Sequence, residues 1–145
     1  MGFSLIACSV LFTVPASPGF TVTTVDALDL PQRLAAADLD GNHRVDLFVV
    51  ADGPDGSRLQ VLLNHGGHFT PGWTKSYANG PGGVFDVDLA DTDNDGDRDV
   101  VFCIGIGAPG QLFNDGLGNF DALGLVPTLS VRFENELVDI NGNGT

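Results

Sequence analysis

An acidic run, "DTDNDGDRD" at residues 91–99, is the part of the sequence best suited to binding chemistry. Its nine positions hold five aspartates and one arginine. In a turn of this length the side-chain oxygens at positions 1, 3 and 5 can converge on one point. A backbone carbonyl at position 7 can turn inward, and position 9 can return a carboxylate. Oxygen ligands of high negative charge in a flexible loop are what Ca²⁺ selects, so the run predicts a calcium site.

The predicted ligands of this loop are four side chains and one backbone carbonyl. The side chains are those of Asp91, Asp93, Asp95 and Asp99, and the carbonyl is that of Asp97. Gly96 is expected to supply the positive φ angle that lets the loop close, because glycine adopts such angles without steric cost.

A second run of the same form, "DLDGNHRVD", occupies residues 38–46. Its predicted ligands are the side chains of Asp38, Asp40, Asn42 and Asp46 and the backbone carbonyl of Arg44. Two differences weaken this loop: Asn42 is neutral, and His43 stands where the other loop has glycine. Histidine tolerates the left-handed region better than most residues. We therefore expect closure with some strain, and weaker binding than at residues 91–99.

A third run, "DINGNGT", begins at residue 139. It offers Asp139, Asn141 and Asn143, followed by Thr145, but it has no ninth position. We expect this loop to be incomplete as a metal site.

The three runs belong to an internal repeat of about 50 residues. From Asp38 to Asp91 is 53 residues, and from Asp91 to Asp139 is 48. A second landmark, a phenylalanine after a glycine-containing turn, recurs in the same phase at Phe20, Phe69 and Phe120. A fixed period of this size indicates a repeat architecture.

Each repeat contains short apolar segments of strand character, separated by glycine, proline and asparagine. The chain has 20 glycines and 8 prolines, which favours many turns and few helices. The predicted strands are residues 33–37, 45–50 and 59–64, then 84–90, 100–104 and 111–114, and finally 130–138. Four short strands in about 50 residues are typical of a β-propeller blade. The sequence predicts an all-β propeller fragment with about two complete four-stranded blades and parts of two flanking blades.

The repeat phase also predicts the boundaries of the units. Residues 33–75 are expected to form the blade with the first calcium loop, and residues 83–123 the blade with the second. Residues 19–32 are expected to be the last strand of a preceding blade and a linker, and residues 130–145 the start of a truncated third blade. Residues 1–18 are either a signal-like apolar segment or strands of a preceding blade. Closed propellers need about 4 to 8 blades, so the chain is expected to be part of a longer protein.

Charge limits the classes of partner. The 145 residues carry a net charge of −13, which argues against nucleic acid and anionic membrane surfaces, because both require basic patches. No apolar run reaches the roughly 20 residues of a membrane-spanning helix. Cations are the expected partners.

The acidic runs have two other interpretations. An EF-hand needs a glutamate at position 12 of its loop, where this chain has Phe102 and Val49. Ordinary acidic turns also use Asp, Asn and Gly. Three runs in register, each with oxygen donors at positions 1, 3 and 5, argue against that simpler explanation.

The spacing D-x-D-x-D-G-x-x-D, followed by an apolar strand and by "LFNDGLGNF" at residues 112–120, resembles the FG-GAP/VCBS repeats of integrin α-subunit-like β-propellers. The resemblance covers nearly all of residues 20–145. It implies that each acidic loop joins the first two strands of a blade and binds Ca²⁺ structurally. It also implies ligand roles for Asp91, Asp93, Asp95, Asp97 and Asp99, and the matching roles at Asp38, Asp40, Asn42, Arg44 and Asp46.

No catalytic constellation is evident in the sequence. The three histidines, His43, His65 and His68, do not pair with a serine or cysteine in a recognisable nucleophile motif. We expect a non-enzymatic calcium-binding scaffold for protein or glycan ligands or for adhesion. Extracellular Ca²⁺ levels suit loops of this kind, so a secreted or cell-surface location is expected. The alternatives are an accessory propeller portion of a secreted lyase or hydrolase, and a carbohydrate-binding propeller.

Overall fold

The computed structural model describes residues 10–16, 19–25, 31–53, 56–78, 83–104 and 110–125. Every regular element in these ranges is a β-strand. Across the same ranges there is no helix of the length and apolar character needed to cross a membrane. The third acidic loop and the strand predicted at residues 130–138 lie outside the described residues.

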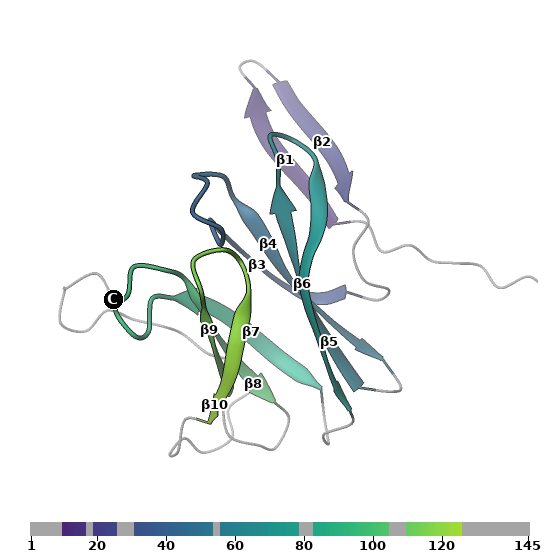
Figure 1. The fold of residues 1–145 in the computed structure, drawn as a ribbon. Helices are drawn as coiled ribbons and strands as arrows, with labels where there is room; N and C mark the ends of the chain where they lie inside the picture. The colour runs from purple at the N-terminus through teal and green to yellow at the C-terminus, as the bar shows by residue number, and fades with distance from the viewer. Residues whose placement is uncertain are drawn as a thin grey trace, which may run out of the picture.

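The strands form one hairpin and two four-stranded sheets (Figure 1). The hairpin consists of β1 (Val10–Ala16) and β2 (Gly19–Val25). The first four-stranded sheet contains β3 (Pro31–Ala37), β4 (Asp46–Gly53), β5 (Gly56–Asn64) and β6 (Phe69–Ala78). The second contains β7 (Val84–Ala90), β8 (Asp99–Ile104), β9 (Gly110–Asn114) and β10 (Phe120–Leu125).

Both four-stranded sheets are antiparallel, with strands neighbouring one another in chain order. This arrangement confirms the all-β prediction and is that of two successive blades of a propeller. The division of the chain into blades and flanking segments, including the assignment of residues 1–18 and 19–32, stays a prediction.

The strand bounds differ from the predicted ones around the turn between β4 and β5. Pairing of these strands continues to Gly53 opposite Gly56, beyond the predicted end at residue 50. Asp52 and Gly53 do not continue the apolar pattern of the strand, so the sequence does not mark the last part of the strand pairing. At the other end, Val45 lies in the loop with an exposed side chain rather than in β4.

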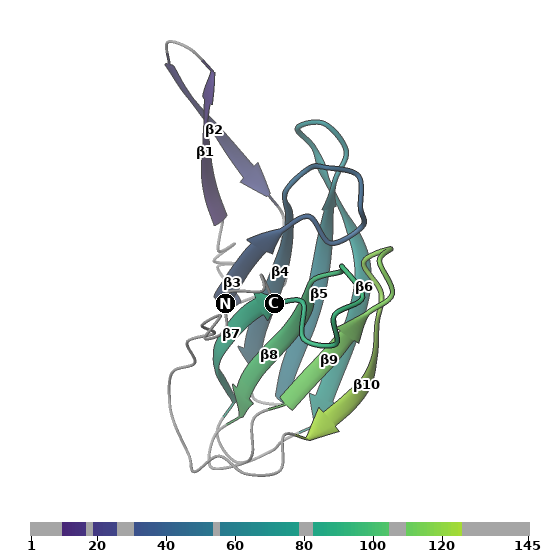
Figure 2. The same ribbon diagram turned by 90° about the vertical axis from the view of Figure 1, so that its left-hand side faces the viewer.

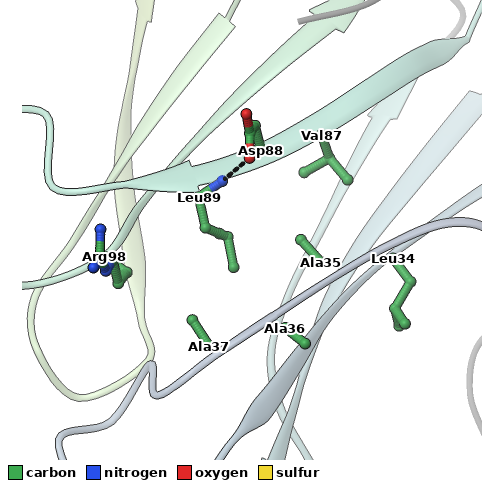
Figure 3. Close-up of a pocket in the computed structure, with 8 residues that line it drawn as sticks. All are labelled: Leu34, Ala35, Ala36, Ala37, Val87, Asp88, Leu89 and Arg98. Atoms are coloured by element: carbon green, nitrogen blue, oxygen red, sulfur yellow. Dashed lines mark hydrogen bonds between the residues drawn. The ribbon is translucent and has the colours of Figure 1, made fainter. Parts of the chain in front are cut away.

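The two sheets pack together along their first strands, β3 and β7 (Figure 2). Ala35 and Ala37 of β3 point toward β7, and Val87 and Leu89 of β7 point toward β3 (Figure 3). All four side chains belong to or pack against the main hydrophobic core. Alanines on β3 allow the close approach of the two strands, since they fill little space.

The main core lies between the sheets and is shared by both repeats. Phe120 of β10 meets Phe48 of β4 edge to face at a centroid distance of 5.5 Å, and meets Trp73 of β6 at 5.4 Å. The buried members of this core are Leu39, Phe48, Val50, Leu59, Val61, Val84, Val87, Val100, Phe102, Leu112 and Phe120. Because neither sheet could bury these side chains alone, the core fixes one repeat against the other.

A β-bulge in β7 adjusts which residues reach this core. The register between β7 and β8 shifts between Val84 and Asp86. In a regular strand Val84 and Val87 would point to opposite faces, because the side-chain period is two. The extra residue at the bulge lets both valines join the same core cluster.

Candidate metal centre

The two acidic loops occupy the positions that the repeat pattern predicts. The first joins β3 to β4 and the second joins β7 to β8, so each connects the first two strands of its sheet. Each loop brings together three carboxylates from its positions 1, 3 and 9. In each group one oxygen per residue lies within 4.8 Å of the others; the groups are Asp38, Asp40 and Asp46, and Asp91, Asp93 and Asp99.

Positions 5 and 7 of the loops are not part of these groups. The Asn42 side chain donates to Asp40 Oδ2 at 2.8 Å, and its own oxygen accepts the Arg44 N–H at 2.8 Å. Asp95 Oδ1 accepts the Asp97 N–H at 2.9 Å. The ligand roles of all ten predicted loop residues stay predictions.

The backbone of the two loops turns in the same way. Positions 4 and 6 have positive φ in both loops: Gly41 (73°) and His43 (63°) in the first, and Asn94 (70°) and Gly96 (101°) in the second. Gly96 takes the conformation predicted for it, and His43 adopts the left-handed region despite its side chain. The need for a left-handed residue at position 4 was missed in the sequence, although glycine and asparagine there both favour it.

The aspartate at position 1 organises each turn through backbone hydrogen bonds. Asp91 accepts the N–H groups of Asn94 at 2.7 Å and Gly96 at 3.0 Å. Asp38 accepts those of Asn42 at 3.1 Å and His43 at 2.8 Å. These are Asx-type bonds, which hold a turn in place from its first residue.

The aspartate at position 9 ties each loop to the third strand of its sheet. Asp99 is fully buried and accepts N–H groups from Thr92 at 2.9 Å and Asn114 at 2.9 Å, together with the Thr92 hydroxyl. Asp46 is equally buried and accepts the N–H groups of Leu39 at 2.8 Å and Asn64 at 2.7 Å. The buried carboxylate thus fixes both ends of the loop through contacts within the protein.

The loops hold more negative charge than their surroundings compensate. Burial raises the pKa of Asp46, and the charges of Asp40 and Asp38 act in the same direction. The pKa of Asp93 is also raised, first by loss of hydration and then by the charges of Asp95 and Asp99. A cation placed among these oxygens would reverse the electrostatic contribution, because an opposite charge favours the ionised form.

The donor set limits which class of cation would fit. Every donor in the two groups is a carboxylate oxygen. Hard cations such as Ca²⁺ and Mg²⁺ prefer oxygen ligands, whereas zinc and copper sites usually include imidazole or thiolate. The residues present therefore fit Ca²⁺.

Comparison with protein families agrees with the fold and the loops. Residues 38–102 match the profile of the FG-GAP-like repeat. Over these residues the chain is similar to an FG-GAP-like repeat. The matched segment runs from the first residue of the first acidic loop into β8, so it contains both acidic loops. Residues 38–102 are called the FG-GAP-like repeat region below. The resemblance to FG-GAP repeat proteins is thereby confirmed. Among curated proteins, none matches the chain.

Proposed function

We propose that the FG-GAP-like repeat region binds one Ca²⁺ ion at each of its two acidic loops and that the ions stabilise a scaffold for binding or adhesion. The observation that carries this proposal is the recurrence of the same three-carboxylate group, at positions 1, 3 and 9, in both repeats. A generic acidic surface would not repeat its geometry with the period of the fold.

The chain's own residues would hold the ion in three ways. The carboxylates at positions 1 and 9 keep the loop closed through their backbone bonds, and the carboxylate at position 3 completes the group. The predicted ligands at positions 5 and 7 would complete the usual 6 to 8 oxygens. The ion supplies positive charge among carboxylates that otherwise repel one another.

Such an ion would act on stability rather than on a reaction. A ligand that binds only the folded chain stabilises it by about 2.7 kcal/mol when its concentration is 100 times the dissociation constant. The net charge of −13 adds a general attraction for cations.

We place the protein outside the cell, where Ca²⁺ is abundant enough to fill sites with dissociation constants of about 0.1 to 1 mM. The scaffold would be non-enzymatic and would present its surfaces to a protein or glycan ligand.

The two loops are expected to differ in affinity, and calorimetric titration with Ca²⁺ tests the ranking. Asp93→Ala should remove the tighter binding event and leave the weaker one, while Asp40→Ala should do the reverse. The second loop has five aspartates against three in the first, so we expect its affinity to be higher by about tenfold.

Asp121→Ala serves as the control for this titration, because Asp121 is an exposed carboxylate on β10 outside both loops. It should leave both binding events unchanged. Equal losses of affinity in the two loop variants would contradict the ranking. Absence of Ca²⁺ binding in the unmodified chain would refute the proposed function.

A further inference from the structure

The side chain of Asn114, at the end of β9, reaches the backbone of both acidic loops. Its Nδ2 donates to the Leu39 carbonyl in the first loop at 2.9 Å and to the Arg98 carbonyl in the second at 3.1 Å. Leu39 lies between Asp38 and Asp40, which hold two of the three grouped carboxylates. The Asn114 NH₂ therefore links the two backbone segments that carry the two carboxylate groups.

The orientation of the Asn114 amide is set by its other contacts. Its Oδ1 accepts the N–H groups of Gly116 and Gly118, each at 3.2 Å, so Nδ2 faces the two carbonyls. Its backbone N–H donates to Asp99 Oδ1 at 2.9 Å, and the residue is 5% exposed. A buried amide with every group engaged holds its partners in one arrangement.

The turn that follows Asn114 also lies directly against the first loop. A Cβ atom on Gly118 would come within 3.1 Å of Leu63 Cδ2 and 3.7 Å of the Leu39 carbonyl oxygen. A Cβ atom on Gly41, in the first loop, would lie 3.6 Å from the Gly116 carbonyl oxygen. The second repeat thus covers the first loop at close range.

Asn64 occupies the same position in the first repeat and provides an internal comparison. Its Nδ2 donates to the Val45 carbonyl at 3.0 Å, and its Oδ1 accepts the N–H groups of Gly66 and Gly67. These side-chain partners all belong to the first repeat. Among the bonds of the described residues, only the Asn114 side chain links one loop to the other.

We propose that Asn114 couples the two loops, so that ion binding at the first loop depends on the second repeat being docked against it. This inference rests on the proposed calcium binding. Asn114 acts as a positioning residue, since it holds the backbone between two carboxylates without contributing a ligand. By linkage, an ion in the first loop would strengthen the docking of the second repeat by the same factor.

Calcium titration of the full chain with one loop disabled tests the coupling. Asp93→Ala leaves the first loop as the intact site, and Asn114→Asp is then added. Aspartate keeps the oxygen that accepts from Gly116 and Gly118 but lacks the NH₂ group. We expect the first loop to lose about tenfold in Ca²⁺ affinity, because the buried Leu39 carbonyl loses its donor and faces a carboxylate oxygen instead. The added negative charge alone would act in the opposite direction and raise the affinity. Unchanged affinity would overturn the proposal.

The matched control uses the opposite pair of substitutions. Asp40→Ala leaves the second loop intact, and Asn64→Asp is added in the first repeat. Since Asn64 does not reach the second loop, its Ca²⁺ affinity should stay the same. An equal loss of affinity here would mean that substituting either asparagine weakens distant sites through general destabilisation. It would contradict a role specific to Asn114.

Amide hydrogen exchange in chelator separates this inference from the proposed function. Asn114→Asp should speed exchange at Leu39 and His43 of the first loop by about tenfold, while Asn64→Asp should leave Thr92 and Gly96 unchanged. Equally fast exchange across β4 and β5 would indicate unfolding of the repeat and would contradict a local coupling. A chain that binds no Ca²⁺ but shows the expected exchange would refute the calcium role and support the link through Asn114.

Discussion

Asp99→Asn is expected to lower the free energy of unfolding by about 3 kcal/mol, measured by urea denaturation in chelator. The two oxygens of Asp99 accept N–H groups from two different segments, at Thr92 and at Asn114. Asparagine has one oxygen, so its NH₂ group would face one of these donors. The side chain is fully buried, and water cannot replace the lost bond.

Asp95→Asn is the control, because Asp95 is an exposed aspartate of the same loop. Its Oδ1 accepts the Asp97 N–H, and an asparagine oxygen can still do so. We expect this substitution to change the free energy of unfolding by less than about 0.5 kcal/mol. Equal effects of the two substitutions would show that the buried carboxylate does not anchor the loop.

Phe120→Ala is expected to destabilise the chain by about 4 kcal/mol in the same denaturation experiment. The ring is 1% exposed and packs edge to face against Phe48 and Trp73 of the other repeat. Removing it leaves a cavity at the point where the two sheets meet. The loss should therefore appear as weaker docking of one repeat on the other.

Phe69 is the matched position in the first repeat. It is only partly buried and packs against the smaller cluster of Leu47, Val49 and Leu62 on the other face of its sheet. Phe69→Ala should cost about 1.5 kcal/mol, since less apolar surface is lost from the interior. A cost as large as that of Phe120→Ala would contradict the central place of Phe120 between the repeats.

Much of the fold could be predicted from the sequence because the repeat fixes the phase of the strands. β7 spans residues 84–90 as predicted, since alternation of apolar and acidic residues marks its middle from Phe85 to Leu89. The bulge at Val84 and Asp86 was not predicted, because the pattern does not show where an extra residue interrupts the ladder. That detail depends on the packing of the neighbouring sheet.

The candidate site was predictable in part for the same reason. Spacing alone indicated that the side chains at positions 1, 3, 5 and 9 of each loop converge, and the structure groups the carboxylates at positions 1, 3 and 9. The role of Asn114 was not predictable, although asparagine ends the corresponding strand of both repeats. Its bond to Leu39 spans 75 residues and arises only when the second repeat docks on the first. Local sequence does not encode such a contact.

Thermal unfolding of the full chain in millimolar CaCl₂ and in chelator tests the calcium role most directly. Ca²⁺ should raise the melting temperature by about 5 to 10 °C, and MgCl₂ at the same concentration should raise it less, because Mg²⁺ gives up its water reluctantly. A melting temperature that is the same in Ca²⁺ and in chelator would contradict calcium-stabilised folding.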